Sequence, residues 1–173
     1  MKSKIFLTIA LTGFLTVCFG QQTPAWDKWN WLIGTWVGEG SGQPGEGNGS
    51  FSFSLNLDRN IIERKSHTEF PPANGKPASL HEDLLIVYHG AEGAADKAIY
   101  FDNEGHVINY AISYSEKSIV LTSEKVQGMP FFRLVYTLLE GGKVNTRFEM
   151  SRDGVNFTSY IEGKSKKSPD ATL

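Results

Sequence analysis

The chain has little cysteine and no surplus of basic charge. Cys18 is the single cysteine among its 173 residues, so a disulfide framework within the chain is excluded. Lysines and arginines number 17 against 19 aspartates and glutamates, which gives a formal charge of −2. Because nucleic-acid-binding proteins neutralise phosphates with clustered basic side chains, we expect no nucleic-acid partner. The length and the 40% of hydrophobic residues indicate one ordinary folded domain with its own core.

An uncharged apolar run occurs once, over residues 5–19, directly after two lysines and before a polar stretch. This pattern is typical of a cleaved secretory signal peptide, and the run is shorter than the roughly twenty residues that span a bilayer. We therefore expect a secreted or periplasmic protein without a membrane span. Lipid attachment at Cys18 is the weaker alternative, because Val17 stands where a lipid-attachment motif has a small residue. Cleavage after Gly20 leaves about 153 residues, no cysteine and a net charge of about −4.

Long helical patterns are missing from the rest of the chain. Trp26, Trp29 and Ile33 lie on one face of a short helix that would end at Gly34. Beyond it, short runs of β-branched and aromatic residues alternate with glycine-rich turns, which is the pattern of antiparallel hairpins. The predicted strands are 35–40, 49–57, 60–70, 80–89, 97–102, 106–114, 118–125, 131–139, 144–151 and 157–163.

Alternation along the strands favours a barrel over a sandwich. Phe51 and Phe53 alternate with Ser52 and Ser54, so this strand has one apolar face and one polar face. A closed meander buries all such faces around one interior and leaves no exposed edge. We predict an all-β fold, an antiparallel meander β-barrel of about ten strands with a short N-terminal helix. The expected segments are a signal peptide (1–20), an N-terminal segment with the helix (21–34), the barrel (35–167) and a flexible tail (168–173).

A short motif connects the chain to a known group of barrels. Gly34, Thr35 and Trp36, followed by Gly38 and Gly40, resemble the opening of lipocalin-like and fatty-acid-binding-like barrels, which are calycin-type folds. The longer form of the motif resembles that of the nitrobindin-type ten-stranded barrels and of secreted bacterial domains of unassigned function. The resemblance implies that Trp36 packs across the closed end of the barrel. It also implies that the interior binds a small hydrophobic or carboxylated molecule.

The resemblance also raises haem as a cofactor, since some nitrobindins ligate its iron through a histidine on the last strand. Matching the basic tails of the chains puts Tyr160 at that position. Tyrosinate can ligate ferric haem, but a tyrosine on a strand is more often a packing residue. Haem binding through Tyr160 therefore remains one of the alternatives.

Arg64 is the unusual residue of its strand. It shares a face with Ile62, so alternation turns its guanidinium inward, where it needs an anionic partner or several acceptors. Two interpretations are open. Arg64 forms a structural ion pair with Asp83 or Glu82 of the next strand, or it contacts a ligand, as the inward arginine of fatty-acid-binding-like barrels does with a nearby tyrosine. The candidate hydroxyls are those of Tyr100, Tyr110 and Tyr136.

Two histidines are candidates for the interior. His81 shares a strand face with Asp83, but the sequence does not settle which face of the strand 80–89 is the inner one. His106 shares the more apolar face of its strand with Tyr110. His67 shares a charged face and is expected in solvent. No two histidines have the spacing of a local metal site, so no metal is predicted.

The leading hypothesis is a secreted barrel that binds a small hydrophobic or amphipathic ligand in its interior. The alternatives are a haem protein with a non-histidine ligand and a barrel enzyme, an isomerase or hydrolase that uses interior histidine and aspartate. No catalytic residue is assigned, because the sequence shows no nucleophile with its base and orienting group. The candidate ligand-binding residues are Arg64, Tyr100, His106, Tyr110, His81 and Tyr160.

Overall fold

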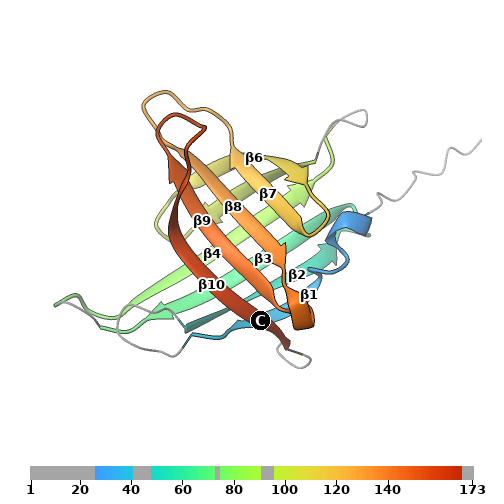
Figure 1. Ribbon diagram of the computed structural model, residues 1–173, viewed down its shortest axis with the longest axis horizontal. Coiled ribbons are helices and arrows are strands. Elements are labelled where there is room, and N and C mark those ends of the chain that lie inside the picture. Colours follow the sequence, from blue (N-terminus) through green and yellow to red (C-terminus); the bar gives the residue numbers. More distant parts are fainter. Residues whose placement is uncertain (1–25, 41–47, 73–74, 91–95, 169–173) are drawn as a thin grey trace, which may run out of the picture.

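Ten antiparallel strands close into one barrel in the computed structural model (Figure 1). The structure describes residues 26–40, 48–72, 75–90 and 96–168, so the predicted signal peptide lies outside the described residues. Each strand pairs with its neighbours in the chain and β1 pairs with β10, which confirms the predicted meander barrel. The strands are β1 (Gly34–Gly38), β2 (Asn48–Asn56), β3 (Ile61–Phe70), β4 (Ser79–Tyr88), β5 (Lys97–Asp102), β6 (Val107–Tyr114), β7 (Ser118–Ser123), β8 (Phe131–Leu138), β9 (Val144–Ser151) and β10 (Thr158–Ser168).

The last strand differs most from its prediction. It was expected over 157–163 but continues to Ser168, because its second half pairs with β1 from Ser165 opposite Gly38 to Ser168 opposite Thr35. This stretch is polar and rich in lysine, so local composition favours a loop. Its pairing with β1 closes the barrel and gives its backbone groups their hydrogen bonds.

One end of the barrel is closed by the segment before β1. This segment contains a single 3₁₀ turn, η1 (Asp27–Trp29), seen in blue at the right of Figure 1. Trp29, Leu32 and Trp36 are fully buried there. The Trp36 indole donates a hydrogen bond to the Leu32 carbonyl at 2.8 Å, and the Trp29 indole donates to the Tyr114 hydroxyl at 2.9 Å. Trp36 therefore has the structural role that the motif implied.

The turn between β2 and β3 lies at the same closed end. Leu57, Asp58 and Arg59 have φ of 49°, 52° and 67°, a left-handed conformation that non-glycine residues seldom adopt. The Trp26 indole donates to the Arg59 carbonyl at 2.8 Å, and the Asn60 amide donates to the Leu57 carbonyl at 2.7 Å. The first bond joins the turn to the segment before β1, and the second lies within the turn.

Alternate residues of the strands fill the closed half of the interior, as the period of two predicts. Aromatic packing links distant strands, since the Tyr136 ring meets the Phe53 ring edge-on at 5.2 Å. No helix among the described residues is long and apolar enough to cross a membrane. The buried inward side chains include Phe53, Ile62, Leu85, Val87, Ala98, Leu121 and Val144.

Candidate functional site

The barrel end opposite η1 is open, and its β8 to β10 side is apolar. Strand pairing puts Phe132 opposite Met150 and Phe148 opposite Ile161, all on the inner face. The Phe132 and Phe148 rings stack at 5.6 Å. Met150 and Ile161 are nevertheless 41% and 51% exposed, so solvent reaches the inner face at this end.

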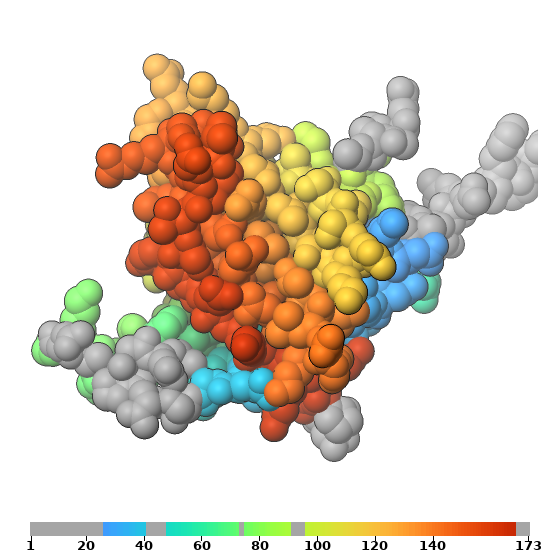
Figure 2. Space-filling view, viewed as in Figure 1, coloured from blue at the N-terminus to red at the C-terminus, as the bar shows by residue number. Residues whose placement is uncertain are grey.

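The wall of β9 and β10 leaves space inside the barrel. Gly163 lies opposite Thr146 on the inner face, and a Cβ added to Gly163 would have no heavy atom of the described chain within 4 Å. The Thr146 Oγ1 is buried without a hydrogen-bond partner among the described residues. In Figure 2 deeper-lying atoms come into view on the left, between the red surface of β10 and the cyan atoms of β1. The open end is therefore accessible along β10.

The opposite wall carries a buried ion pair. Arg64 of β3 and Asp83 of β4 contact each other with side chains only 7% and 5% exposed. The Arg64 guanidinium carbon lies 5.5 Å from the centre of the Phe51 ring and 5.9 Å from that of Tyr136, so it lies among aromatic rings. Burial acts to lower the pKa of Arg64, but Asp83 together with the nearby tyrosines raises it above its ordinary value. Arg64 is therefore a permanent interior cation whose charge Asp83 compensates.

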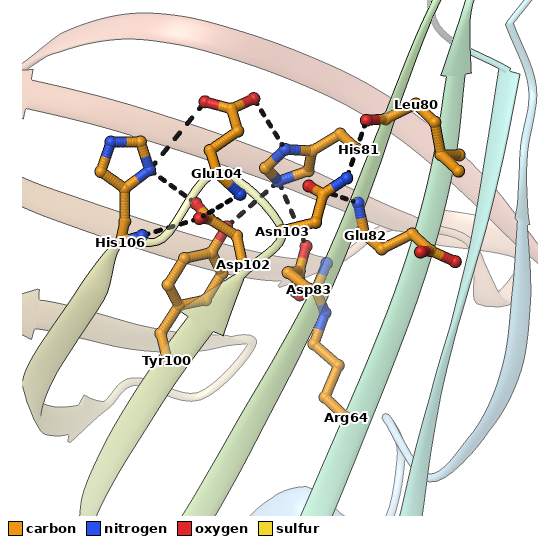
Figure 3. A network of polar contacts seen from close by, with 10 residues as sticks. All are labelled: Arg64, Leu80, His81, Glu82, Asp83, Tyr100, Asp102, Asn103, Glu104 and His106. Atoms are coloured by element: carbon orange, nitrogen blue, oxygen red, sulfur yellow. Dashed lines mark hydrogen bonds and ion pairs between the residues drawn. The ribbon is translucent and has the colours of Figure 1, made fainter.

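A chain of polar contacts continues from Asp83 to the rim of the open end (Figure 3). The His81 Nε2 lies 3.7 Å from the Asp83 carboxylate and 3.1 Å from the Tyr100 hydroxyl. That hydroxyl donates to Asp102 at 3.3 Å, and Asp102 contacts the His106 ring at 2.8 Å. Burial acts to raise the pKa of Asp102, but hydrogen bonds from the backbone and ring of His106 lower it below its ordinary value. Asp102 is therefore a carboxylate near neutral pH.

The turn after β5 is fastened to β4 by its own side chains (Figure 3). The Asp102 carboxylate accepts from the backbone N–H of Glu104 at 3.0 Å and of His106 at 2.9 Å. The Asn103 amide donates to the Leu80 carbonyl at 3.0 Å. Sequence reasoning treated these residues only as a turn and missed Asp102 as a network member. The sequence does contain a signal for this role, because Asp102 stands two residues before Glu104 and four before His106, whose N–H groups it accepts from.

Two tyrosine hydroxyls lie deeper, next to the ion pair. Tyr110 and Tyr136 are buried, and neither hydroxyl has a partner among the described residues. Burial is the main cause that raises the pKa of both phenols, so both stay protonated in water. The Nε of Arg64 is likewise buried without a partner in the described chain. The charge of Arg64 acts on the pKa of both phenols, so the three donors lie close together in the interior.

The structure brings Arg64, Tyr100, Tyr110 and His81 together on the inner wall. Alternation predicted the inward side chain of Arg64, whereas the inner face of the strand that carries His81 was left open by the sequence. Of the two carboxylates offered for Arg64, the partner is Asp83.

His106 differs from its expectation. Its side chain was expected on the inner face of the strand, but β6 begins one residue later and the side chain is 58% exposed. Its ring and its backbone N–H both contact Asp102 of the inner face, so His106 lies at the exposed rim of the polar network.

Tyr160 lies in a bulge of β10 near the open end. A register shift between Ser159 and Ile161 interrupts the alternation of β10, and Tyr160 is 73% exposed. Its ring contacts only the edge of the Phe148 ring, at 6.5 Å, among the aromatic pairs of the described residues.

The histidines of the chain do not fit haem. The Nδ1 of His89 contacts Asp96 at 2.5 Å, and its ring stacks on Trp26 at the closed end. His67 contacts Glu69 and Glu82 on the outer face. His81 and His106 belong to the polar chain at the rim. No group of three or more metal-ligating side chains gathers in the described ranges, and we derive no step through a haem or a metal.

An open depression of about 650 Å³ adjoins the polar wall. Most of its lining residues point outward from β3 to β5 and three belong to the inner face, so the depression lies on the outer side of this wall. The lining residues are Lys65, Ser66, His67, Glu82, Asp83, Leu84, Phe101, Asp102 and Asn103.

Comparison with known proteins identifies no family for this chain. No model of a protein family matches the chain, and a search of curated proteins finds no match. The class that the fold defines is the closed ten-stranded antiparallel barrel, which is consistent with a calycin-like architecture.

Proposed function

We propose that this protein binds a small hydrophobic or amphipathic molecule inside the barrel. The observation that carries the proposal is the open end, where Met150 and Ile161 face inward and are still exposed. Neighbouring apolar side chains that stay exposed to solvent as one patch mark a binding site more often than singly exposed ones do. Ligand sites are concave and mostly apolar, with a few polar groups that orient the ligand. The apolar wall of β8 to β10 and the polar wall around Arg64 supply these two components.

Two further parts of the proposal rest on the sequence. The N-terminal apolar run is typical of export, so the ligand would be met outside the cytoplasm. The motif at Gly34 to Trp36 resembles that of lipocalin-like and nitrobindin-like barrels, many of which bind small molecules in their interior. Both points agree with a binding protein and both are separate from the geometry.

The test is saturable binding of a neutral apolar dye, Nile red, followed by its fluorescence. We expect one dye per chain and a loss of binding in Gly163→Phe, because the new ring enters the space opposite Thr146. Glu162→Phe is the matched control, since it adds the same ring to the outer face of the same strand. Equal binding by the two variants, or no saturable binding by the wild type, would contradict an interior site.

A second function, acid and base catalysis, is favoured by one contact. The His81 Nε2 lies 3.1 Å from the Tyr100 hydroxyl, whose other neighbour is Asp102 at 3.3 Å. A histidine within hydrogen-bond reach of an oriented hydroxyl can move a proton to or from a substrate. Burial raises the pKa of Tyr100, so the phenol would act as the acid and not as a phenolate.

Hydrolysis of p-nitrophenyl esters of increasing chain length tests this second function. Turnover that is lost in His81→Gln and kept in His67→Gln would support it, because His67 stands on the outer face of the neighbouring strand. Absence of turnover above the buffer rate, or equal rates in both variants, would exclude ester hydrolysis at this network.

A further inference from the structure

The deepest polar groups of the interior are hydrogen-bond donors without acceptors. The Arg64 Nε and the hydroxyls of Tyr110 and Tyr136 are buried, and none has a partner among the described residues. A buried donor without an acceptor is unfavourable, so such groups are retained where an acceptor arrives with a ligand. Three donors around one position specify a ligand atom that accepts more than one hydrogen bond.

The charges around these donors are already compensated. Asp83 contacts Arg64 directly, and Asp102 lies further along the same wall near Tyr100. Among the described residues the other cation of the inner face is Lys167, which lies at the closed end with its Nζ 5.5 Å from the Trp36 ring. A carboxylate brought to Arg64 would lose its water and meet the charge of Asp83, and the described part of the inner face has no further cation beside it.

We propose that the interior selects apolar molecules that end in an uncharged oxygen acceptor, a ketone, ester or amide carbonyl, over carboxylates of the same length. This inference rests on the proposed function and names the ligand class of that site. The carbonyl oxygen would accept hydrogen bonds from the Arg64 Nε and from the phenols of Tyr110 and Tyr136. The apolar body would extend along the Phe132 and Phe148 wall toward the open end.

The first experiment compares 2-dodecanone with dodecanoate as competitors of Nile red on the wild-type protein at pH 8, where dodecanoate is ionised. We expect the ketone to displace the dye at a concentration about tenfold lower. The ionised dodecanoate would be repelled by Asp83, and this cost exceeds the free energy of one neutral hydrogen bond. Equal or stronger displacement by dodecanoate would overturn the inference. It would leave the proposed function in place, because the dye itself reports on that function.

Variants then separate the head group from the apolar body. In Tyr136→Phe we expect about fivefold weaker binding of the ketone, as one hydrogen bond is lost, with the affinity for Nile red unchanged. Tyr88→Phe is the control, because Tyr88 lies on the outer face of β4 and should change neither value. Equal ketone affinity in Tyr136→Phe and the wild type would also count against the inference.

Asp83→Asn gives the opposite prediction. Without the compensating carboxylate, Arg64 has a free charge, so the preference should reverse toward dodecanoate by about tenfold. A folded variant that still prefers the ketone would overturn the charge argument. If Asp83→Asn does not fold, the ranking by the wild type and the effect of Tyr136→Phe decide. Failure of the wild type to bind Nile red at all would overturn the proposed function and this inference together.

Discussion

Replacing the Tyr136 hydroxyl should stabilise the protein without a ligand, although the residue is fully buried. Its ring packs against Phe53 at 5.2 Å and against Phe51 at 5.9 Å, and Tyr136→Phe keeps both contacts. The hydroxyl has no partner among the described residues. A buried hydroxyl without a partner costs about 1 to 3 kcal/mol, so its removal should raise the free energy of unfolding by about 1 kcal/mol or more.

Tyr114→Phe makes the same chemical change and should have the opposite effect. The Tyr114 hydroxyl donates to the Asp96 carboxylate and accepts from the Trp29 indole at 2.9 Å. A hydrogen bond to a charged group contributes about 1.5 to 3 kcal/mol, so this variant should lose about 2 kcal/mol. The two variants should therefore differ by about 3 kcal/mol, or by about 6 to 12 °C in Tm for a domain of this size.

The assay is urea unfolding of both variants and the wild type, followed by tryptophan fluorescence, with thermal melts as a second measure. The m-values should agree, so that the midpoints report stability alone. A loss of stability in Tyr136→Phe comparable to that in Tyr114→Phe would refute the reasoning. It would mean that the Tyr136 hydroxyl has a partner in solution, and the donor that the ligand class depends on would already be satisfied.

Three further predictions concern the ion pair, a strand contact and pH. Arg64→Met and Asp83→Leu should each lower the free energy of unfolding by about 3 to 5 kcal/mol, since each single change leaves a buried charge unpaired. The double variant should recover most of this loss. A double-mutant cycle of urea midpoints that shows no coupling would contradict this prediction. Gly49→Ala should destabilise the protein by more than about 2 kcal/mol in thermal melts, because the new Cβ would lie 2.7 Å from a backbone oxygen of β3. A Tm within about 2 °C of the wild-type value would refute the steric clash. The pKa of Asp102 is lowered by its bonds to His106, so its contribution is present above the ordinary value of 3.8 and lost as the pH falls through the folded pKa. The slope of unfolding free energy against pH between about 5 and 3 should accordingly be shallower in Asp102→Asn, and an unchanged slope would disprove the linkage.

Most of the barrel was predictable because its determinants are local. The alternation of Phe51 and Phe53 with serines defines one apolar face, and it requires no knowledge of distant residues. The same rule turned Arg64 inward, where it is buried. The motif around Trp36 implied an indole packed across the closed end. The structure shows this indole buried, and adds its hydrogen bond to the carbonyl four residues earlier.

The candidate site was predictable only in part, because its contacts are made between strands. Asp83 and Glu82 are neighbours in the chain and lie on opposite faces of β4. The register of β3 against β4 decides that the inward one meets Arg64. A shift between Ser159 and Ile161 interrupts the alternation at Tyr160, the residue that matching the basic tails put at the haem position, and Tyr160 is 73% exposed.

The sequence by itself determined the strands, their single inner face and the inward arginine, since side-chain direction on a strand follows from its period of two. Only the tertiary structure decided that β10 continues to Ser168 and that Asp83 compensates Arg64. It also decided that the phenols of Tyr110 and Tyr136 lie beside this pair without acceptors in the described part of the chain. The physical reason is that register, closure and hydrogen-bond partners depend on segments far apart in the chain, and these meet only when the barrel closes.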